Sequence, residues 1–213
     1  MKIRNIPQYI QISWNDFLRK KIIMPPKIRK LKNKDFTVIA SNCNGGVMCH
    51  DFNLEFKTPT VNLSMNAEDY IKFIKNLEGY INSDIIELKN AGFSYPVGIL
   101  GGDITLHFMH YKTFEDAVNK WNERKKRINW DNMFFMMTDR DGCTEEMVRE
   151  FEQLSFKNKI IFTSKPYPNY KSVIFCKEYE NEKNVPIMTE WRNCRGERLY
   201  DRYFDFVDWL NGS

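Results

Sequence analysis

The sequence lacks any apolar run near the roughly 20 residues that a membrane-spanning helix needs. It also lacks a Gly-x-Ser-x-Gly elbow, a P-loop and the glycine-rich dinucleotide fingerprint, and three histidines give a hydrolase triad little support. The five cysteines are an odd number spread along the chain, which excludes a disulfide-stapled miniprotein and favours free thiols. Lys2 and Arg4 are followed by Pro7 and polar residues, so we expect no signal peptide and a cytoplasmic protein.

The sequence is rich in charged residues, and the basic ones are concentrated near the N-terminus. Residues 1–34 hold ten Lys or Arg against the single acid Asp16, a balance of +9 that leaves −5 for the remainder of a chain with net charge +4. We predict a basic leader at 1–34 and an α/β domain at 35–213, either single or built from two subdomains. Nucleic acid is not an expected partner, because the body is net acidic and its aromatic residues are not interleaved with cations.

The basic leader has two interpretations. It can attract an anionic membrane surface, placing the protein peripherally at the inner face of the membrane, or it can pack on the body as a solvated segment. Pro25 and Pro26 are expected to break any single long helix within it.

From residue 35 onward, short β-branched or aromatic runs alternate with helical periods. This alternation predicts a layered α/β/α fold of Rossmann-like type, with a mainly parallel or mixed sheet. Helices are expected after the capping residues Asn66, Thr113 and Thr144, and a short one near the C-terminus at 203–210. Strands are expected at 36–40, 60–63, 95–100, 104–109, 133–137, 160–163 and 173–176, with 95–100 and 104–109 forming a hairpin.

Ligands of open α/β sheets bind at the carboxyl ends of the strands, so the loops there are the first candidate sites. The loop at 41–46 follows the first predicted strand. Its glycines would let backbone amides approach an anion, and its polar side chains can bond phosphate or sugar hydroxyls. The candidate substrate-binding residues are Ser41, Asn42, Asn44, Gly45 and Gly46. An ordinary tight turn is the alternative.

A second candidate loop follows the apolar run 133–137. Asp139 and Asp141 lie one residue apart there, and such a pair can hold Mg2+ or Mn2+ against a diphosphate. Because Asp and Gly are also common turn residues, the loop is either a metal site or a turn that leads into the next helix.

A third group combines acid–base and binding candidates. His110, at a predicted strand end, is a candidate catalytic residue because histidine exchanges a proton near neutral pH, and Asp103 is the alternative base. A structural histidine that bonds the following loop is the other interpretation of His110. The candidate substrate-binding residues of this group are Tyr111, Trp121, Arg124 and Arg127. The arginines would grip an anionic group or form ion pairs with aspartates. Arg124 or Lys125 also falls at the edge of an apolar helix face, where a cation needs a partner.

Five blocks in fixed order resemble a bacterial family of unknown function whose members are usually labelled exopolysaccharide or capsule biosynthesis proteins. The blocks are FTVIASNCNGG, TPTVNLSMNAEDYIKFIKNLEGYI, YPVGILGGDITLHFMHYKTFEDAVNKWNERKKRIN, MTDRDGCTEE and FEQLSFKNKIIFTSKPY. The resemblance covers about residues 25–205 and implies an α/β fold and a role in building surface polysaccharide. It implies no particular catalytic mechanism. Asn44 departs from the family's pattern, where an aromatic residue, typically Trp, is expected.

These observations favour a transferase that acts on an activated sugar, such as a nucleotide sugar, or on a lipid-linked glycan intermediate. In that hypothesis the two aspartates hold the metal ion, the arginines neutralise phosphate, and His110 or Asp103 is the base on the acceptor hydroxyl. Two alternatives remain open: a non-catalytic accessory or glycan-binding module, and an acyl- or phosphotransferase that modifies the glycan.

Overall fold

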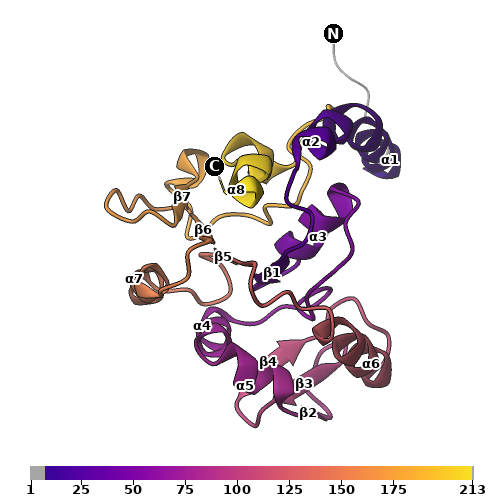
Figure 1. Ribbon diagram of the computed structural model, residues 1–213, viewed down its shortest axis with the longest axis vertical. Helices are drawn as coiled ribbons and strands as arrows, with labels where there is room; N and C mark the ends of the chain where they lie inside the picture. The colour runs from indigo at the N-terminus through magenta and orange to yellow at the C-terminus, as the bar shows by residue number, and fades with distance from the viewer. Residues whose placement is uncertain (1–7, 213) are drawn as a thin grey trace.

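The centre of the molecule is a four-stranded sheet in the order β1-β5-β6-β7, and every neighbouring pair of its strands is parallel. The structure, a computed structural model, describes residues 8–212, so residues 1–7 of the predicted leader and Ser213 lie outside the described part. The strands are β1 (Thr37–Ala40), β5 (Met133–Thr138), β6 (Lys159–Thr163) and β7 (Val173–Phe175). The predicted α/β fold with a mainly parallel sheet is confirmed (Figure 1).

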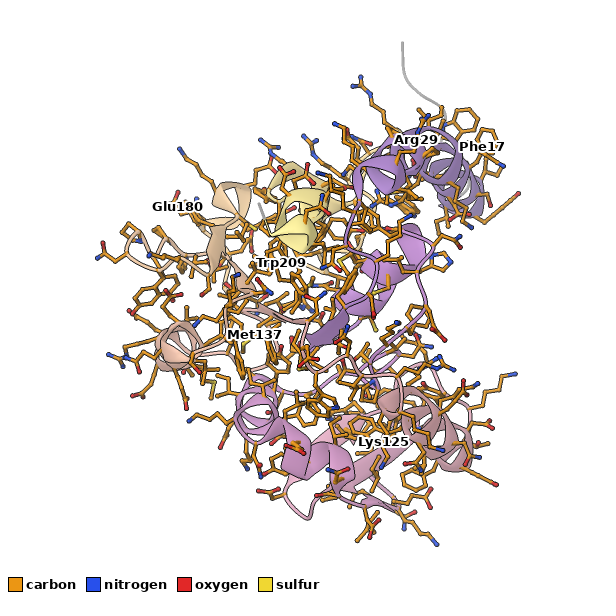
Figure 2. The ribbon with its side chains drawn as sticks, in the orientation of Figure 1. Phe17, Arg29, Lys125, Met137, Glu180 and Trp209 are labelled. Carbon is orange, nitrogen blue, oxygen red and sulfur yellow. The ribbon has the colours of Figure 1, made fainter. Side chains whose placement is uncertain are left out.

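Both faces of this sheet are covered, because its strands are apolar on both sides. Side chains alternate along β5: Phe135 and Met137 join one core, whereas Phe134 and Met136 join the other. Met137 lies near the middle of the molecule (Figure 2). The first core is shared with α4 (Ala67–Lys75) and α7 (Glu145–Gln153), and the second with α3 (Asn44–Asp51) and α8 (Phe206–Asn211). The result is a layered α/β/α arrangement.

A small antiparallel sheet, in the order β2-β3-β4, lies beside the first core. Its strands are β2 (Ile85–Glu87), β3 (Val97–Leu100) and β4 (Ile104–His107), and its flanking helices are α5 (Leu77–Asn82) and α6 (Phe114–Lys125). The predicted hairpin is therefore confirmed, whereas β2 was not predicted. Leu100, Ile104 and Trp121 belong to the same buried cluster as Phe135, so the small sheet shares a core with the main sheet.

The predicted helix caps are confirmed. The side chains of Asn66, Thr113 and Thr144 each accept a hydrogen bond from the backbone N–H three residues later, at 2.7, 3.1 and 3.3 Å. The apolar stripe after Asn66 is buried as expected but spans two helices, α4 and α5. Asn76 separates them because its backbone, with φ −129° and ψ 49°, is not helical.

Two predictions about the chain after β1 are wrong. No strand forms at 60–63, because Asn62 adopts a left-handed φ of 64°, which ends the extended conformation. The loop expected at 41–46 ends early, because α3 begins at Asn44. Gly45 and Gly46 are therefore helical. A Cβ on Gly45 would lie 2.9 Å from the Cβ of Ala40. That glycine therefore lets α3 pack closely on β1.

The N-terminal segment stays helical from residue 8 to residue 30. α1 (Gln8–Leu18) continues into a π-helical turn (Arg19–Ile23) and then α2 (Met24–Lys30). As expected of Pro25 and Pro26, the segment is not one long α-helix: α2 begins at Met24, and both prolines occupy its first turn, where no N–H is required. Met24 and Leu31 pack in the core that α3 and α8 share.

The remaining described helices are short 3-10 turns at Lys177–Tyr179 and Leu199–Arg202. Within residues 8–212, no helix is both long enough and apolar enough to cross a bilayer.

Candidate functional site

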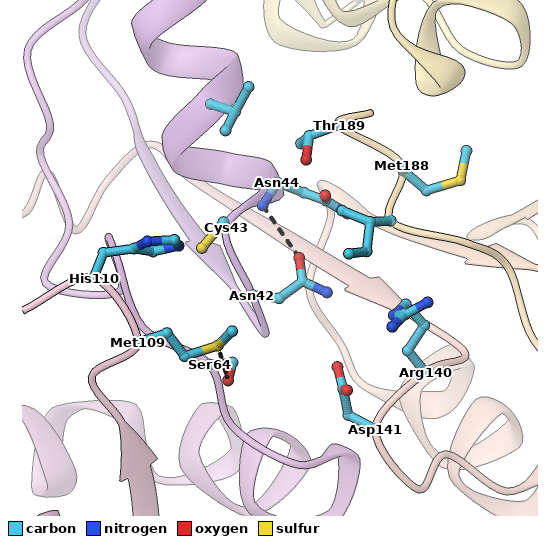
Figure 3. Close-up of a pocket in the computed structure, with 12 residues that line it drawn as sticks. Asn42, Cys43, Asn44, Ser64, Met109, His110, Arg140, Asp141, Met188 and Thr189 are labelled. Carbon is cyan, nitrogen blue, oxygen red and sulfur yellow. Dashed lines mark hydrogen bonds between the residues drawn. The ribbon is translucent and has the colours of Figure 1, made fainter. Parts of the chain in front are cut away.

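A cavity of about 400 Å³ opens at the carboxyl ends of β1 and β5 (Figure 3). Its volume lies in the range of small-molecule sites, about 300–1,000 Å³. The walls come from residues 42–44 with Val47, from Ser64, and from residues 109–110, 140–141 and 187–189. We call it the carboxyl-edge pocket. Its position is the one expected for ligands of parallel α/β sheets.

Asn42 positions the first turn of α3 at this pocket. Its Nδ2 donates to Thr138 Oγ1 at the end of β5 at 3.1 Å, and its Oδ1 accepts from the backbone N–H of Asn44 at 3.1 Å. One amide therefore ties the end of β1 to the end of β5 and to the beginning of α3. The first N–H groups of a helix have no intrahelical acceptor and carry partial positive charge, which favours an anionic ligand group.

Asn44 supplies an independent sign of a ligand. It lines the pocket with only 4% of its surface exposed, and its Nδ2 has no hydrogen-bond partner among residues 8–212. An unpaired buried amide costs about 1–3 kcal/mol. In the described chain, the other buried side-chain N or O atoms without partners belong to Asn15 and Trp121, which do not line this pocket. Asn44 is therefore a donor that a ligand acceptor could satisfy.

The basic and acidic side chains of the pocket lie on opposite sides of these two asparagines. Figure 3 shows His110 on one side and Arg140 with Asp141 on the other. The Arg140 guanidinium is held by a hydrogen bond from Nη1 to the carbonyl of Val185 at 3.1 Å. Desolvation raises the pKa of Asp141, although Arg140 and His107 oppose the shift. The pocket thus offers one fixed cation, a carboxyl and an imidazole.

Cys43 also lines the pocket, but its thiol is not suited to attack a substrate. Burial raises its pKa, and the thiolate is the nucleophilic form of cysteine.

The two aspartates predicted to hold a metal ion do not form a ligand pair. Asp139 Oδ2 accepts from the Ser164 N–H at 2.6 Å and Oδ1 from the Val185 N–H at 2.8 Å, so both oxygens hold backbone loops in place. Asp141 alone faces the pocket. Across residues 8–212, no group of three or more His, Cys, Asp or Glu side chains could hold a metal ion. The side chains present do not fit the predicted Mg2+ or Mn2+ site.

Three predicted substrate-binding residues instead stabilise the small-sheet region. Trp121 is 1% exposed and packs against Phe73 with ring centroids 6.1 Å apart, so it cannot stack on a sugar. Arg124 donates to the Tyr111 hydroxyl at 2.7 Å and lies 5.5 Å from the Phe56 ring centroid. The predicted need of this cation for a partner is thus confirmed, and Tyr111 is that partner.

The remaining predicted residues also lie outside the pocket lining. Asp103 accepts from the Tyr80 hydroxyl at 3.1 Å in the β3–β4 turn, and Arg127 pairs with Glu123. Ser41 is buried behind the pocket, where its backbone continues the pairing with β5. Of the predicted site residues, the structure brings Asn42, Asn44, His110 and Asp141 together.

Residues 14–211 match a family described as a domain of unknown function, DUF1919. The chain belongs to the DUF1919 family. It is also 42% identical over 183 residues to a Haemophilus influenzae protein described as uncharacterized, covering 86% of this chain and 87% of that relative.

Sequence reasoning missed most of the pocket lining in this DUF1919 chain, including Cys43, Val47, Ser64, Met109, Arg140 and residues 187–189. Arg140 lies between the two aspartates, and its place in a strand-end loop could have identified it. Residues 187–189 come from a segment without regular secondary structure, about 50 positions further along the chain. No periodicity marks that segment, so its contact with the pocket was not predictable from pattern.

Proposed function

We propose that this protein is a transferase that binds a phosphate-bearing activated sugar in the carboxyl-edge pocket and acts in bacterial exopolysaccharide or capsule biosynthesis. The observation that carries the proposal is the unpaired, buried amide of Asn44 in the first turn of α3, in a pocket that also holds Arg140. The biosynthetic role rests on the family resemblance of the sequence blocks.

Each part of the pocket has a role that its chemistry supports. The first turn of α3 and Arg140 would bind phosphate, since a helix N-terminus and a guanidinium both favour an anion. Asn44, Ser64 and Thr189 offer hydrogen bonds to sugar hydroxyls, and Val47, Met109 and Met188 give the apolar wall. His110 is the base that would accept the proton of the attacking hydroxyl. No step requires Asp139.

Thermal unfolding of the purified chain with nucleoside diphosphates and nucleotide sugars, each with and without Mn2+, tests the proposal. A ligand at 100 times its Kd adds about 2.7 kcal/mol, which raises Tm by about 5 °C or more for a chain of this size. We expect a shift with a sugar-linked donor that does not require Mn2+. A cooperative melt that no member of the panel shifts would contradict the proposal.

Two variants locate the binding site. Arg140→Gln should weaken the donor about 10- to 100-fold, because hydrogen bonds to a charged group are worth about 1.5–3 kcal/mol. The matched control is Arg149→Gln, an exposed arginine of α7 outside the pocket lining. His110→Ala should retain donor binding and lose turnover. Equal weakening by both arginine variants would place the donor elsewhere.

A further inference from the structure

An ordinary surface helix turns its apolar face toward the core, but helix α1 turns its apolar side chains toward solvent. Asn15 of α1 and Arg19, the first residue of the π-helical turn that follows α1, face the body and are 0% and 2% exposed. The aromatic and aliphatic side chains of α1 are exposed instead, and the rings of Trp14 and Phe17 stack with centroids 6.0 Å apart. Figure 2 shows Phe17 at the outer edge of the molecule. Contacts within the described chain, such as the hydrogen bond from the Trp14 indole to the Cys194 carbonyl, still leave 51% of Trp14 exposed.

Exposed apolar side chains are concentrated at this one place. Twelve large apolar residues are exposed in the described chain, and six of them fall between residues 9 and 22. A large exposed apolar patch marks a surface that meets another apolar phase or molecule. We call this surface the N-terminal face. It consists of Tyr9, Ile10, Ile12, Trp14, Phe17 and Ile22.

Buried polar contacts hold the N-terminal face outward. Asn15 Oδ1 accepts from the Gly196 N–H at 3.0 Å, and Arg19 binds Asp51 and Asp201 at 2.6 Å each. Rotating α1 to bury its apolar side chains would break these contacts. The carboxylates of Asp51 and Asp201 would then stay buried without the Arg19 guanidinium that compensates them. The apolar exposure is therefore a fixed property of the fold.

Cations follow the N-terminal face along the chain. Exposed basic side chains lie in the π-helical turn, in α2 and in the residues directly after α2: Lys20, Lys21, Arg29, Lys30, Lys32 and Lys34. Between residues 8 and 34 the single acid is Asp16, which pairs with Lys20 at 2.8 Å. Phe17 and Arg29 lie at the same end of the molecule in Figure 2. The surface thus joins apolar side chains to a strong positive charge.

We propose that the N-terminal face docks on the surface of an anionic lipid bilayer. Aromatic and aliphatic side chains enter the boundary between headgroups and acyl chains, while the neighbouring cations are attracted to anionic headgroups at about 1 kcal/mol each. The charge disfavours a second copy as the occupant, because a symmetric dimer would bring like charges together. The contact is mixed in character, unlike the purely electrostatic one expected from the leader's charge.

Docking would also bring the pocket toward the bilayer. Ile12 and Thr189 line one cavity, and Thr189 also lines the carboxyl-edge pocket. The segment 187–196 therefore contacts both the N-terminal helix and the pocket, since the Trp14 indole donates to the Cys194 carbonyl at 3.2 Å. Docking of the N-terminal face does not depend on transferase activity in the pocket.

Cosedimentation of the full chain with vesicles tests the proposal. The vesicles are phosphatidylcholine alone or phosphatidylcholine mixed with phosphatidylglycerol, at low and high salt. We expect binding to the mixed vesicles that high salt weakens but does not abolish, because the apolar part is not screened. Binding should be far weaker to phosphatidylcholine alone.

Two sets of variants separate the apolar and the charged contributions. Phe17→Ser with Ile22→Ser should weaken binding about tenfold or more, because each removes apolar surface from the contact. Lys21→Ser and Lys30→Ser should weaken it about fivefold each at low salt. The matched control is Ile86→Ser with Phe93→Ser, an equally exposed aliphatic and aromatic pair in the small-sheet region. All variants should melt cooperatively, since the altered side chains are exposed.

Three results would overturn the proposal. One is folded protein that does not sediment with mixed vesicles, and another is equal weakening by the control pair. The third is a dimer in sedimentation velocity that the Phe17→Ser and Ile22→Ser pair dissociates, which would assign the face to a second copy. None of these readouts depends on ligand binding in the pocket.

Discussion

Helix α3 carries a buried polar side chain at each end, Asn44 at its beginning and Asp51 at its last turn. The Asp51 carboxylate accepts from Arg19 Nε at 2.6 Å, from the Tyr200 hydroxyl at 2.7 Å and from Arg198 Nε at 2.8 Å. The Asn44 amide nitrogen finds no partner among the described residues. The polar side chain at the C-terminal end of α3 is thus fully hydrogen-bonded within the chain, and we call this the closed end. The side chain at the N-terminal end faces a cavity, and we call this the open end. The number of hydrogen-bond partners of each side chain, more than its residue type, distinguishes the structural end from the candidate ligand-binding end.

The largest expected effect is at the closed end. Asp51→Asn removes one of the two carboxylates that compensate Arg19 and the carboxylate that Arg198 binds, and breaking one partner of a buried ion pair costs about 3–5 kcal/mol. The helix dipole disfavours a carboxylate at a C-terminus, so the bound cations are what make this position favourable. Urea unfolding measures the loss, with Asp131→Asn, an exposed aspartate, as a control expected within about 0.5 kcal/mol. A loss below about 1 kcal/mol at Asp51 would remove the contrast between the two ends.

Gly45→Ala tests whether the first turn of α3 is positioned by its close packing on β1. The added Cβ would meet the Ala40 Cβ at 2.9 Å and the Val38 side chain at 3.0 Å, both in β1. Overpacking of this kind costs about 1–3 kcal/mol, and it should exceed the gain of about 1 kcal/mol in helix propensity. Gly46→Ala meets Val61 at 3.3 Å and should cost less. Urea unfolding of both variants gives the comparison, and equal stabilisation of both would show that α3 does not need close packing on β1.

The sequence predicted those parts of the fold that local pattern controls. Hydrophobic runs marked β1, β5 and β6, and side-chain chemistry marked the caps at Asn66, Thr113 and Thr144. The failed strand at 60–63 contains Asn62, whose left-handed backbone is a single-residue feature that composition does not reveal. The outward orientation of the apolar side chains of α1 could not be predicted from the sequence for a different reason. Its orientation depends on contacts of Arg19 with Asp51 and Asp201, both far away in the sequence.

The candidate site shows a similar division. Strand-end position predicted Asn42, Asn44 and Asp141, because the parallel strands β1 and β5 bring their carboxyl ends together. His110 was also predicted from its place after a strand, but that strand, β4, belongs to the antiparallel sheet. Residue type alone selected Arg124, which bonds Tyr111 within the small-sheet region. Whether a polar group already has a partner depends on tertiary contacts, so the sequence could not distinguish structural groups from groups free to bind a ligand.

The pH dependence of stability should have opposite signs at Asp51, in the last turn of α3, and at Asp141, which lines the pocket beside the first turn of α3. Burial alone would raise the pKa of Asp51, but the hydrogen bond from Arg198 and the charge of Arg19 lower it overall. The stability this carboxylate contributes is present above about pH 4 and is lost as pH falls through its lowered folded pKa.

Asp141 behaves in the reverse sense. Desolvation raises its pKa, so its unfavourable ionisation is absent at low pH and develops as pH rises through the raised value. Urea unfolding across about pH 2 to 7 should show that Asp51→Asn flattens the acid side, whereas Asp141→Asn stabilises modestly near neutrality. Two variants with the same pH profile would contradict the assigned directions.

The smallest stability effect is expected at Asn44 itself. Asn44→Ala loses side-chain packing but also removes an unpaired buried amide, and these opposing contributions should leave stability within about 1 kcal/mol of the original. Asn42→Ala is the matched control, since it is the same residue type in the same pocket but both of its polar groups are bonded, to Thr138 and to the N–H of Asn44. We expect it to cost about 1–3 kcal/mol, because it leaves those partners unsatisfied. In donor titrations, Asn44→Ala should weaken binding while Asp51→Asn, measured where it is folded, should not. A large stability loss at Asn44 with unchanged donor affinity would make both ends of α3 structural.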